Sequence, residues 1–172
     1  MKTLPPETDQ SGPRWMARLV GVLQPLSVRA NRLGSVKLFA GLPWTDLEFA
    51  AACLGESLVE RGTRMTVQGE PSSRLWLITE GEALVSTDAR PVRVAGRGDV
   101  VGGATLLFRL KSPDTTLALT PIRAFEAGPQ QFRELISNPG IRERLALSLR
   151  PTHTKAVDSV RRRPERPGWR AS

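Results

Sequence analysis

Few side chains in this sequence could make or break covalent bonds. His153 is the only histidine and Cys53 the only cysteine, and no spacing indicates a cysteine–histidine pair, a zinc site or a serine triad. Cys53 stands in a run of Ala and Leu and is expected in the core. Thr115 and Thr116 are expected to enter a strand and not to act as nucleophiles. We therefore expect no enzyme, no catalytic residue and no metal site.

A glycine-rich segment, GRGDVVGG at residues 96–103, is the next candidate, because glycine-rich loops can surround a phosphate. Its spacing does not match GxxxxGK[ST], and no Lys-Ser or Lys-Thr follows it. Alone, the segment is a weak indication of a phosphate site. Its meaning depends on the elements that position it.

Short runs of β-forming residues, separated by glycine and aspartate turns, predict strands between residues 57 and 127. Such a series is typical of an all-β sandwich or barrel. The runs are residues 57–60, 63–67, 74–79, 82–87, 91–95, 117–120 and 122–127.

Helical periodicity flanks the strands on both sides. Residues 43–55 are expected to form a helix in which Thr45 and Glu48 make a capping box and Gly55 ends the helix. Two further helices are predicted at residues 130–137 and 141–149. The fold class is therefore α+β: mainly a β jelly-roll barrel with N-terminal and C-terminal helices around one core.

Residues 14–33 are expected to form a further helix with one basic and one apolar side, interrupted at Pro25. Its basic side holds Arg14, Arg18, Arg29 and Arg32, and its apolar side holds Trp15, Leu19, Val22, Leu23 and Leu26. Proline in a helix interior kinks or splits the helix. We expect docking on the barrel or on a second subunit. The alternative is a basic amphipathic helix lying on a membrane.

The formal net charge of +8 is concentrated in the flanks. Residues 1–37 carry six basic and two acidic residues (+4), residues 38–149 twelve and thirteen (−1), and residues 150–172 seven and two (+5). We expect a leader and amphipathic helix at 1–36, a domain at 37–150, and a basic tail at 151–172 with few apolar residues to fold around. No window of 18 apolar residues occurs, and the first residues lack the features of a signal peptide, so we expect a cytoplasmic protein.

The order and spacing of several motifs resemble the cyclic-nucleotide-binding domain, the family of the catabolite activator protein and kinase regulatory subunits. The resemblance covers about residues 37–150 and implies an eight-stranded jelly roll with flanking helices. Glycines fall where the family uses them in turns, which often need positive φ. The motifs are LFAGLPWTDLEFAA, GTRMTVQGE, RLWLITEGEALVS, GRGDVVGGATLL and TTLALTPIRAFE.

The same resemblance implies a phosphate-binding cassette of the form F-G-E-[LIV]-A-L followed by R-[AST]-A-[TV]. Gly102 matches, Gly103 takes the place of the ribose-binding Glu, and Pro113 or Asp114 takes the place of the phosphate-binding Arg. The candidate cassette positions are Gly102, Gly103, Ala104, Thr105, Asp114, Thr115 and Thr116, and possible replacement cations are Arg109 and Lys111. We expect no cyclic nucleotide bound with the family's usual affinity and no other definite cofactor.

Three functions remain open. The first is a stand-alone, degenerate domain acting as a non-catalytic regulatory or protein-interaction module. The second is a sensor of a small molecule or cyclic nucleotide in an altered pocket. The third is a relative of transcription regulators without their helix-turn-helix domain, since only 22 residues follow Arg150. We expect another protein or a second copy as partner, no membrane, and nucleic acid only through electrostatic contacts of the basic tail.

Overall fold

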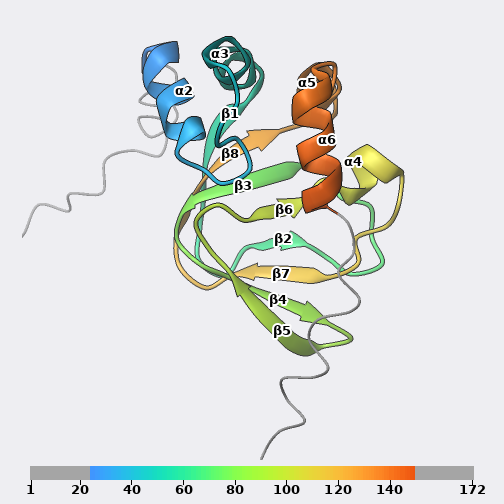
Figure 1. The fold of residues 1–172 in the computed structure, drawn as a ribbon. Helices are drawn as coiled ribbons and strands as arrows, with labels where there is room; N and C mark the ends of the chain where they lie inside the picture. The colour runs from blue at the N-terminus through green and yellow to red at the C-terminus, as the bar shows by residue number, and fades with distance from the viewer. Residues whose placement is uncertain (1–23, 150–172) are drawn as a thin grey trace, which may run out of the picture.

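A computed structural model of the chain describes residues 24–149 (Figure 1). Its helices are α2 (Leu26–Gly34), α3 (Trp44–Cys53), α4 (Ala104–Phe108), α5 (Pro129–Leu135) and α6 (Pro139–Ser148). Its strands are β1 (Gly55–Val59), β2 (Arg64–Thr66), β3 (Leu75–Glu80), β4 (Ala83–Thr87), β5 (Arg90–Ala95), β6 (Val100–Gly102), β7 (Thr115–Ala118) and β8 (Ile122–Ala127). None of these helices is long and apolar enough to cross a bilayer.

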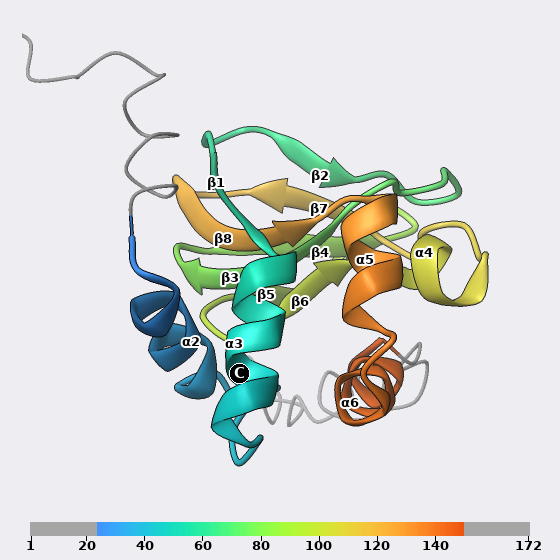
Figure 2. The same cartoon turned by 90° about the horizontal axis from the view of Figure 1, so that it is seen from above.

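The eight described strands form two antiparallel four-stranded sheets, in the orders β1-β8-β3-β6 and β2-β7-β4-β5. Neighbouring strands in each sheet are mostly distant in sequence, as in a jelly roll. Figures 1 and 2 show α2, α3, α5 and α6 on the outer side of the first sheet. The predicted α+β jelly roll with flanking helices is therefore confirmed.

Strand alternation divides the hydrophobic residues of the first sheet between two cores. Leu75 and Leu77 of β3 pack among the helices, together with Phe125 of β8. Ile78 of β3 and Ile122 of β8 point into the barrel instead. This sheet is buried on both faces, and the barrel interior lies between it and the second sheet.

Helix α2 docks on the barrel through arginine side chains. Arg29 and Arg32 both pair with Glu56 of β1, with closest N–O distances of 3.5 and 3.1 Å, and both lie over the ring of Phe125. Arg29 also donates to the carbonyl of Leu54. Within the described residues, the basic side of this helix, which holds Arg29 and Arg32, thus contacts the barrel.

Three sequence predictions about these elements are wrong. The capping box does not form: α3 begins at Trp44 after Pro43, so Thr45 lies inside the helix, and no side-chain cap bond is made. Gly55 does not cap that helix, because it opens β1. Leu26, assigned to an apolar docking face, is 41% exposed.

The predicted break at Pro25 agrees with the structure, in which α2 begins directly after that residue. Residues 14–23 of the predicted helix and the tail at 151–172 lie outside the described residues, as does His153.

Candidate functional site

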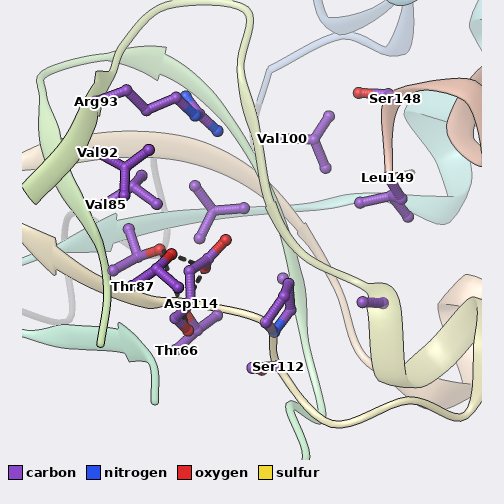
Figure 3. A pocket seen from close by; sticks show the side chains of 15 residues that line it. Thr66, Val85, Thr87, Val92, Arg93, Val100, Ser112, Asp114, Ser148 and Leu149 are labelled. Atoms are coloured by element: carbon purple, nitrogen blue, oxygen red, sulfur yellow. Dashed lines mark hydrogen bonds between the residues drawn. The ribbon is translucent and has the colours of Figure 1, made fainter. Parts of the chain in front are cut away.

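A cavity of about 160 Å³ opens at one end of the barrel interior (Figure 3). Strands of the second sheet, the β6–α4 junction, the segment before β7 and the end of α6 form its walls. The lining residues are Thr66, Val85, Thr87, Val92, Arg93, Val100, Val101, Gly102, Ala104, Ser112, Pro113, Asp114, Thr116, Ser148 and Leu149. Polar and apolar residues contribute to the walls in nearly equal number, with one acidic and one basic side chain among the described lining residues.

The acidic side chain is Asp114, which two threonine hydroxyls hold in place. Thr66 and Thr116 each lie within hydrogen-bond distance of Asp114 Oδ1, at 3.4 and 3.3 Å, and their own hydroxyl oxygens are 3.0 Å apart. Thr66 and Thr116 are buried because β2 and β7 pair with these positions turned into the barrel. Asp114 is thus a positioned carboxylate inside the cavity.

Burial raises the pKa of Asp114 above its ordinary value of 3.8. Hydrogen bonds from Thr116 and Thr66 and the positive charge of Arg93 act in the opposite direction, without cancelling the effect of burial. The carboxylate therefore sits in an environment that resists a second, unpaired negative charge.

The basic side chain is Arg93 of β5, which enters the cavity across from Asp114 in Figure 3. Arg93 pairs with Val85 in the β4–β5 ladder, and Val85 points into the barrel, so Arg93 shares the interior face. Its guanidinium lies 3.3 Å from Oδ2 of Asp99, which also accepts from the Gly96 N–H at 2.9 Å. The charge of Arg93 is therefore already opposed by a carboxylate at the rim.

The cassette glycines have left-handed backbone conformations, with φ of +75° at Gly102 and +81° at Gly103. A Cβ at Gly102 would lie 2.4 Å from the carbonyl oxygen of Arg74. At Gly103 it would lie 2.8 Å from Leu75 Cδ1 and 3.1 Å from Leu149 Cδ1. A glutamate at Gly103 would therefore need the side-chain ends of Leu75 and Leu149 to shift, in a backbone conformation that disfavours any side chain.

The other sequence candidates are divided between the cavity and its outside. Ala104 lines the cavity, whereas Thr105 accepts from the Ser72 N–H and Thr115 accepts from the Gln68 N–H, both at 2.9 Å. Arg109 and Lys111 are exposed and lie outside the lining. A short helix, α4, follows the glycines, with Gly103 at its N-cap.

Sequence reasoning missed five polar residues of the cavity wall, namely Thr66, Thr87, Arg93, Ser112 and Ser148. The signal for Arg93 was its place two residues before the interior position Ala95 in an alternating strand. Thr66 gave no comparable signal, because β2 has three residues and an irregular register with β7.

Two features set limits on other chemistry among residues 24–149. Cys53 is buried as expected, and its burial, together with the nearby Glu134, raises its thiol pKa to about 11, so it is a poor nucleophile at neutral pH. No group of three or more His, Cys, Asp or Glu residues within this part of the chain is placed to hold a metal ion.

Comparison with known proteins identifies the barrel. The family model for the cyclic nucleotide-binding domain matches residues 57–138. Among solved structures, the regulatory domain of Toxoplasma gondii PKA with cAMP aligns at 18% identity and TM-score 0.63, over 71% of this chain and 48% of that one. The regulatory subunit of a cAMP-independent protein kinase A from Trypanosoma brucei aligns at 22% identity and TM-score 0.63, over 73% and 46%.

A third structure, a cAMP-binding acyltransferase from Mycobacterium smegmatis, aligns at 28% identity and TM-score 0.52, over 70% of this chain and 39% of that one. This chain thus spans less than half the length of these three relatives. Residues 57–138 are a jelly-roll domain of the cyclic nucleotide-binding family.

Proposed function

We propose that this domain is a non-catalytic regulatory or protein-interaction module whose barrel does not hold a cyclic nucleotide with the family's usual affinity. The observation that carries the proposal is the carboxylate of Asp114, which lines the cavity near the position where the family's pattern has a phosphate-binding arginine. We expect the module to act on another protein or on a second copy of the chain.

The charge of the cavity supports this proposal. A cyclic phosphate is a monoanion, and its burial requires a cation or several N–H donors. Arg93 is the one cation among the described lining residues, and it forms a half-exposed ion pair with Asp99. Asp114 would in addition repel the phosphate, so an anion would enter against the local charge.

The missing anchors allow an estimate of the effect. A hydrogen bond to a charged group contributes about 1.5–3 kcal/mol. Loss of both the ribose-binding carboxylate and the phosphate-binding guanidinium would cost roughly 3–6 kcal/mol if they acted independently. Because about 1.4 kcal/mol corresponds to a tenfold change, affinity should fall by at least two orders of magnitude.

The size of the cavity supports the same conclusion. Its volume of about 160 Å³ is well below the roughly 300–1,000 Å³ of pockets for drug-sized ligands. Leu149 at the end of α6 and Val92 of β5 occupy two of its sides.

The fold alone does not decide whether this domain binds a cyclic nucleotide or has lost that binding. The structural relatives include one regulatory domain solved with cAMP and one regulatory subunit of a kinase described as cAMP-independent. Since these similarities are below 25% identity, the argument depends on the cavity residues of this chain.

Isothermal titration calorimetry with cyclic AMP and cyclic GMP at physiological salt tests the proposal. We expect no binding below about 100 µM, the consequence of a loss of two orders of magnitude from micromolar affinity. A dissociation constant in the low micromolar range or tighter would refute it. In that case Arg93→Ala, compared with Arg109→Ala and Lys111→Ala, would show which cation holds the phosphate.

A sensor of a different small molecule is the second candidate. It is favoured by the presence of a cavity with a carboxylate already oriented by two hydroxyl groups.

A further inference from the structure

The carboxylate of Asp114 has one oxygen occupied and one available. Oδ1 is within hydrogen-bond distance of the hydroxyls of Thr66 and Thr116. Oδ2 accepts no hydrogen bond from any residue between 24 and 149. The threonines, both at most 4% exposed, fix the side chain so that Figure 3 shows one carboxylate oxygen turned into the cavity. The cavity therefore contains an oriented, partly buried carboxylate oxygen that no side chain or backbone group of the described residues pairs with.

The charges around this acceptor have a negative sum. Among residues 24–149, Arg93 is the one cation of the lining and Asp114 the only other titratable side chain in it. Asp99 at the rim pairs with Arg93 at 3.3 Å. Two carboxylates and one guanidinium leave a formal charge of −1 when all are ionised. Such a site favours a cation and disfavours an anion.

The shape of the cavity limits the cation to a small organic one. A volume of about 160 Å³ is comparable with the engineered cavity of about 150 Å³ that accepts benzene. Val85, Val92 and Val101 supply apolar contact surface on the walls. A metal ion would need several oxygen ligands, and within residues 24–149 Asp114 is the only carboxylate of the lining. A primary ammonium group with a short alkyl chain matches both the acceptor and the walls.

We propose that the barrel cavity binds a small primary alkylammonium compound, with Asp114 as its counter-charge and the valines around its alkyl chain. The ammonium group has three donors, which suit the open oxygen of Asp114 and nearby hydroxyl or carbonyl oxygens. The inference rests on the proposed loss of cyclic-nucleotide binding, because both ligands would need the same space.

Binding of a cation also couples to the protonation of Asp114. Burial holds the pKa of this carboxyl above its ordinary value, and the ammonium binds the ionised form. Arg93 of β5, which pairs with Asp99, is the charged group that faces Asp114 across the cavity, with β4 between β5 and β7 in the same sheet. Affinity should therefore increase as the pH rises from 4 towards 7, whereas a neutral ligand would show no such increase.

Three probes of nearly equal shape and different charge test the proposal on the full chain: n-butylammonium, n-butanol and butyrate. Titrations are followed by amide chemical shifts in ¹H–¹⁵N spectra at pH 7. We expect n-butylammonium to shift residues 66, 85, 114 and 116 and to bind at least tenfold more tightly than n-butanol. Butyrate should bind more weakly than either. Equal or tighter binding of butyrate, shifts outside the cavity, or no shifts with any probe would overturn the proposal.

Asp114→Asn is the matched variant, since it keeps the shape and the Oδ1 acceptor and removes the charge. It should weaken n-butylammonium binding at least tenfold and leave n-butanol unchanged, whereas Asp88→Asn at the exposed β4–β5 turn should change neither. An unchanged affinity in Asp114→Asn would refute the assignment. The pH series on the unmodified protein tests the same point without a variant: an affinity for n-butylammonium that stays flat from pH 4 to 7 contradicts it.

The cyclic-nucleotide titration separates this inference from the proposed function. Micromolar binding of cyclic AMP would refute the proposed function and with it this inference. Absence of both cyclic-nucleotide and ammonium binding would refute this inference alone.

Discussion

Substitution of the cassette glycines should destabilise the fold in an order set by what each new methyl group would contact. Gly62, Gly103 and Gly102 have nearly the same backbone conformation, with φ of +84°, +81° and +75°. Their surroundings differ: an added Cβ would meet nothing within 4 Å at Gly62, side-chain ends at Gly103, and a backbone carbonyl at Gly102. The three Gly→Ala variants therefore separate the cost of the conformation from the cost of the contact.

The conformational cost is common to all three. A non-glycine residue in the left-handed region costs about 1–2 kcal/mol. Reduced freedom of the unfolded chain offsets about 0.4–1 kcal/mol of this. We therefore expect Gly62→Ala to lower the free energy of unfolding by about 1 kcal/mol.

The contact cost is added at the two cassette positions. At Gly103 the Cβ would lie 2.8 Å from Leu75 Cδ1 and 3.1 Å from Leu149 Cδ1. Overpacking of this kind costs roughly 1–3 kcal/mol, so Gly103→Ala should lose about 2–4 kcal/mol in total. At Gly102 the contact is 2.4 Å to the Arg74 carbonyl, whose movement would disturb the β3–β6 ladder, so the loss should be larger again.

Urea unfolding followed by circular dichroism measures the three losses. The reasoning is refuted if Gly103→Ala costs no more than Gly62→Ala, or if Gly102→Ala is the mildest of the three. Gly103→Glu should be destabilised at least as much as Gly103→Ala and should gain no measurable affinity for cyclic AMP, because the phosphate would still lack its counter-charge.

Four further expectations concern the charged groups and the flanks. Burial raises the pKa of Asp114, so the folded state binds its proton more tightly than the unfolded chain does. The free energy of unfolding should therefore fall as the pH rises from about 3.8 through the raised pKa. Urea unfolding from pH 4 to 7 should show a smaller fall in Asp114→Asn. Glu56→Gln should lower the free energy of unfolding by about 1–3 kcal/mol, because it leaves two partly buried arginines uncompensated, and hydrogen exchange in α2 should accelerate. Glu126→Gln breaks a single pair with the half-exposed Arg74 and should lower it by less than about 1 kcal/mol. Equal losses in the two variants would contradict the argument. Deletion of residues 152–172 should leave the melting temperature within a few degrees, and an unfolded circular dichroism spectrum would exclude this. In flotation with anionic vesicles at physiological salt the protein should remain in the bottom fraction; co-flotation abolished by Trp15→Ala and Leu19→Ala would instead support membrane binding.

The strands could be predicted from the sequence because their ends carry turn residues and their interiors alternate. The exception is β6, whose residues Val100–Gly102 stand inside the glycine-rich segment and were interpreted as a loop. Only three residues long, β6 exists through its pairing with β3, in which Val101 is opposite Trp76. Such a long-range partner leaves no periodicity in the local sequence.

The errors at the helices have a related cause. Thr45 and Glu48 have the spacing of a capping box, but the N-cap of α3 is Pro43, two residues before Thr45. Proline is well suited to the start of a helix. The arginines of α2 were assigned to an exposed face, whereas Glu56 and the ring of Phe125 draw them onto the barrel. The pattern of residues within α2 carries no information on where a carboxylate of a distant strand will lie.

For the site, the sequence predicted the loss of the cassette's charged residues but not what replaced them. Asp114 and Thr116 face the cavity while Thr115 faces away, and this follows from alternation at the start of β7. Arg93 joins them only through the β4–β5 register, in which it is opposite Val85. Arg109 and Lys111, nearer in sequence, lie outside because α4 ends in a left-handed residue at Arg109 and directs the chain over the surface.

We propose that the barrel keeps the backbone framework of its family and reverses the charge within it. Replacing a guanidinium by a carboxylate changes the local formal charge by two units, and in a half-buried site this difference is not screened by solvent as it would be at the surface. The left-handed glycines prevent the ribose-binding carboxylate from being restored at Gly103 without disturbing Leu75 and Leu149. A cyclic nucleotide would therefore have to overcome both the charge and the backbone, whereas a small cation would meet neither obstacle. On this proposal, the charge of the ligand decides what the cavity binds, more than its size or shape does.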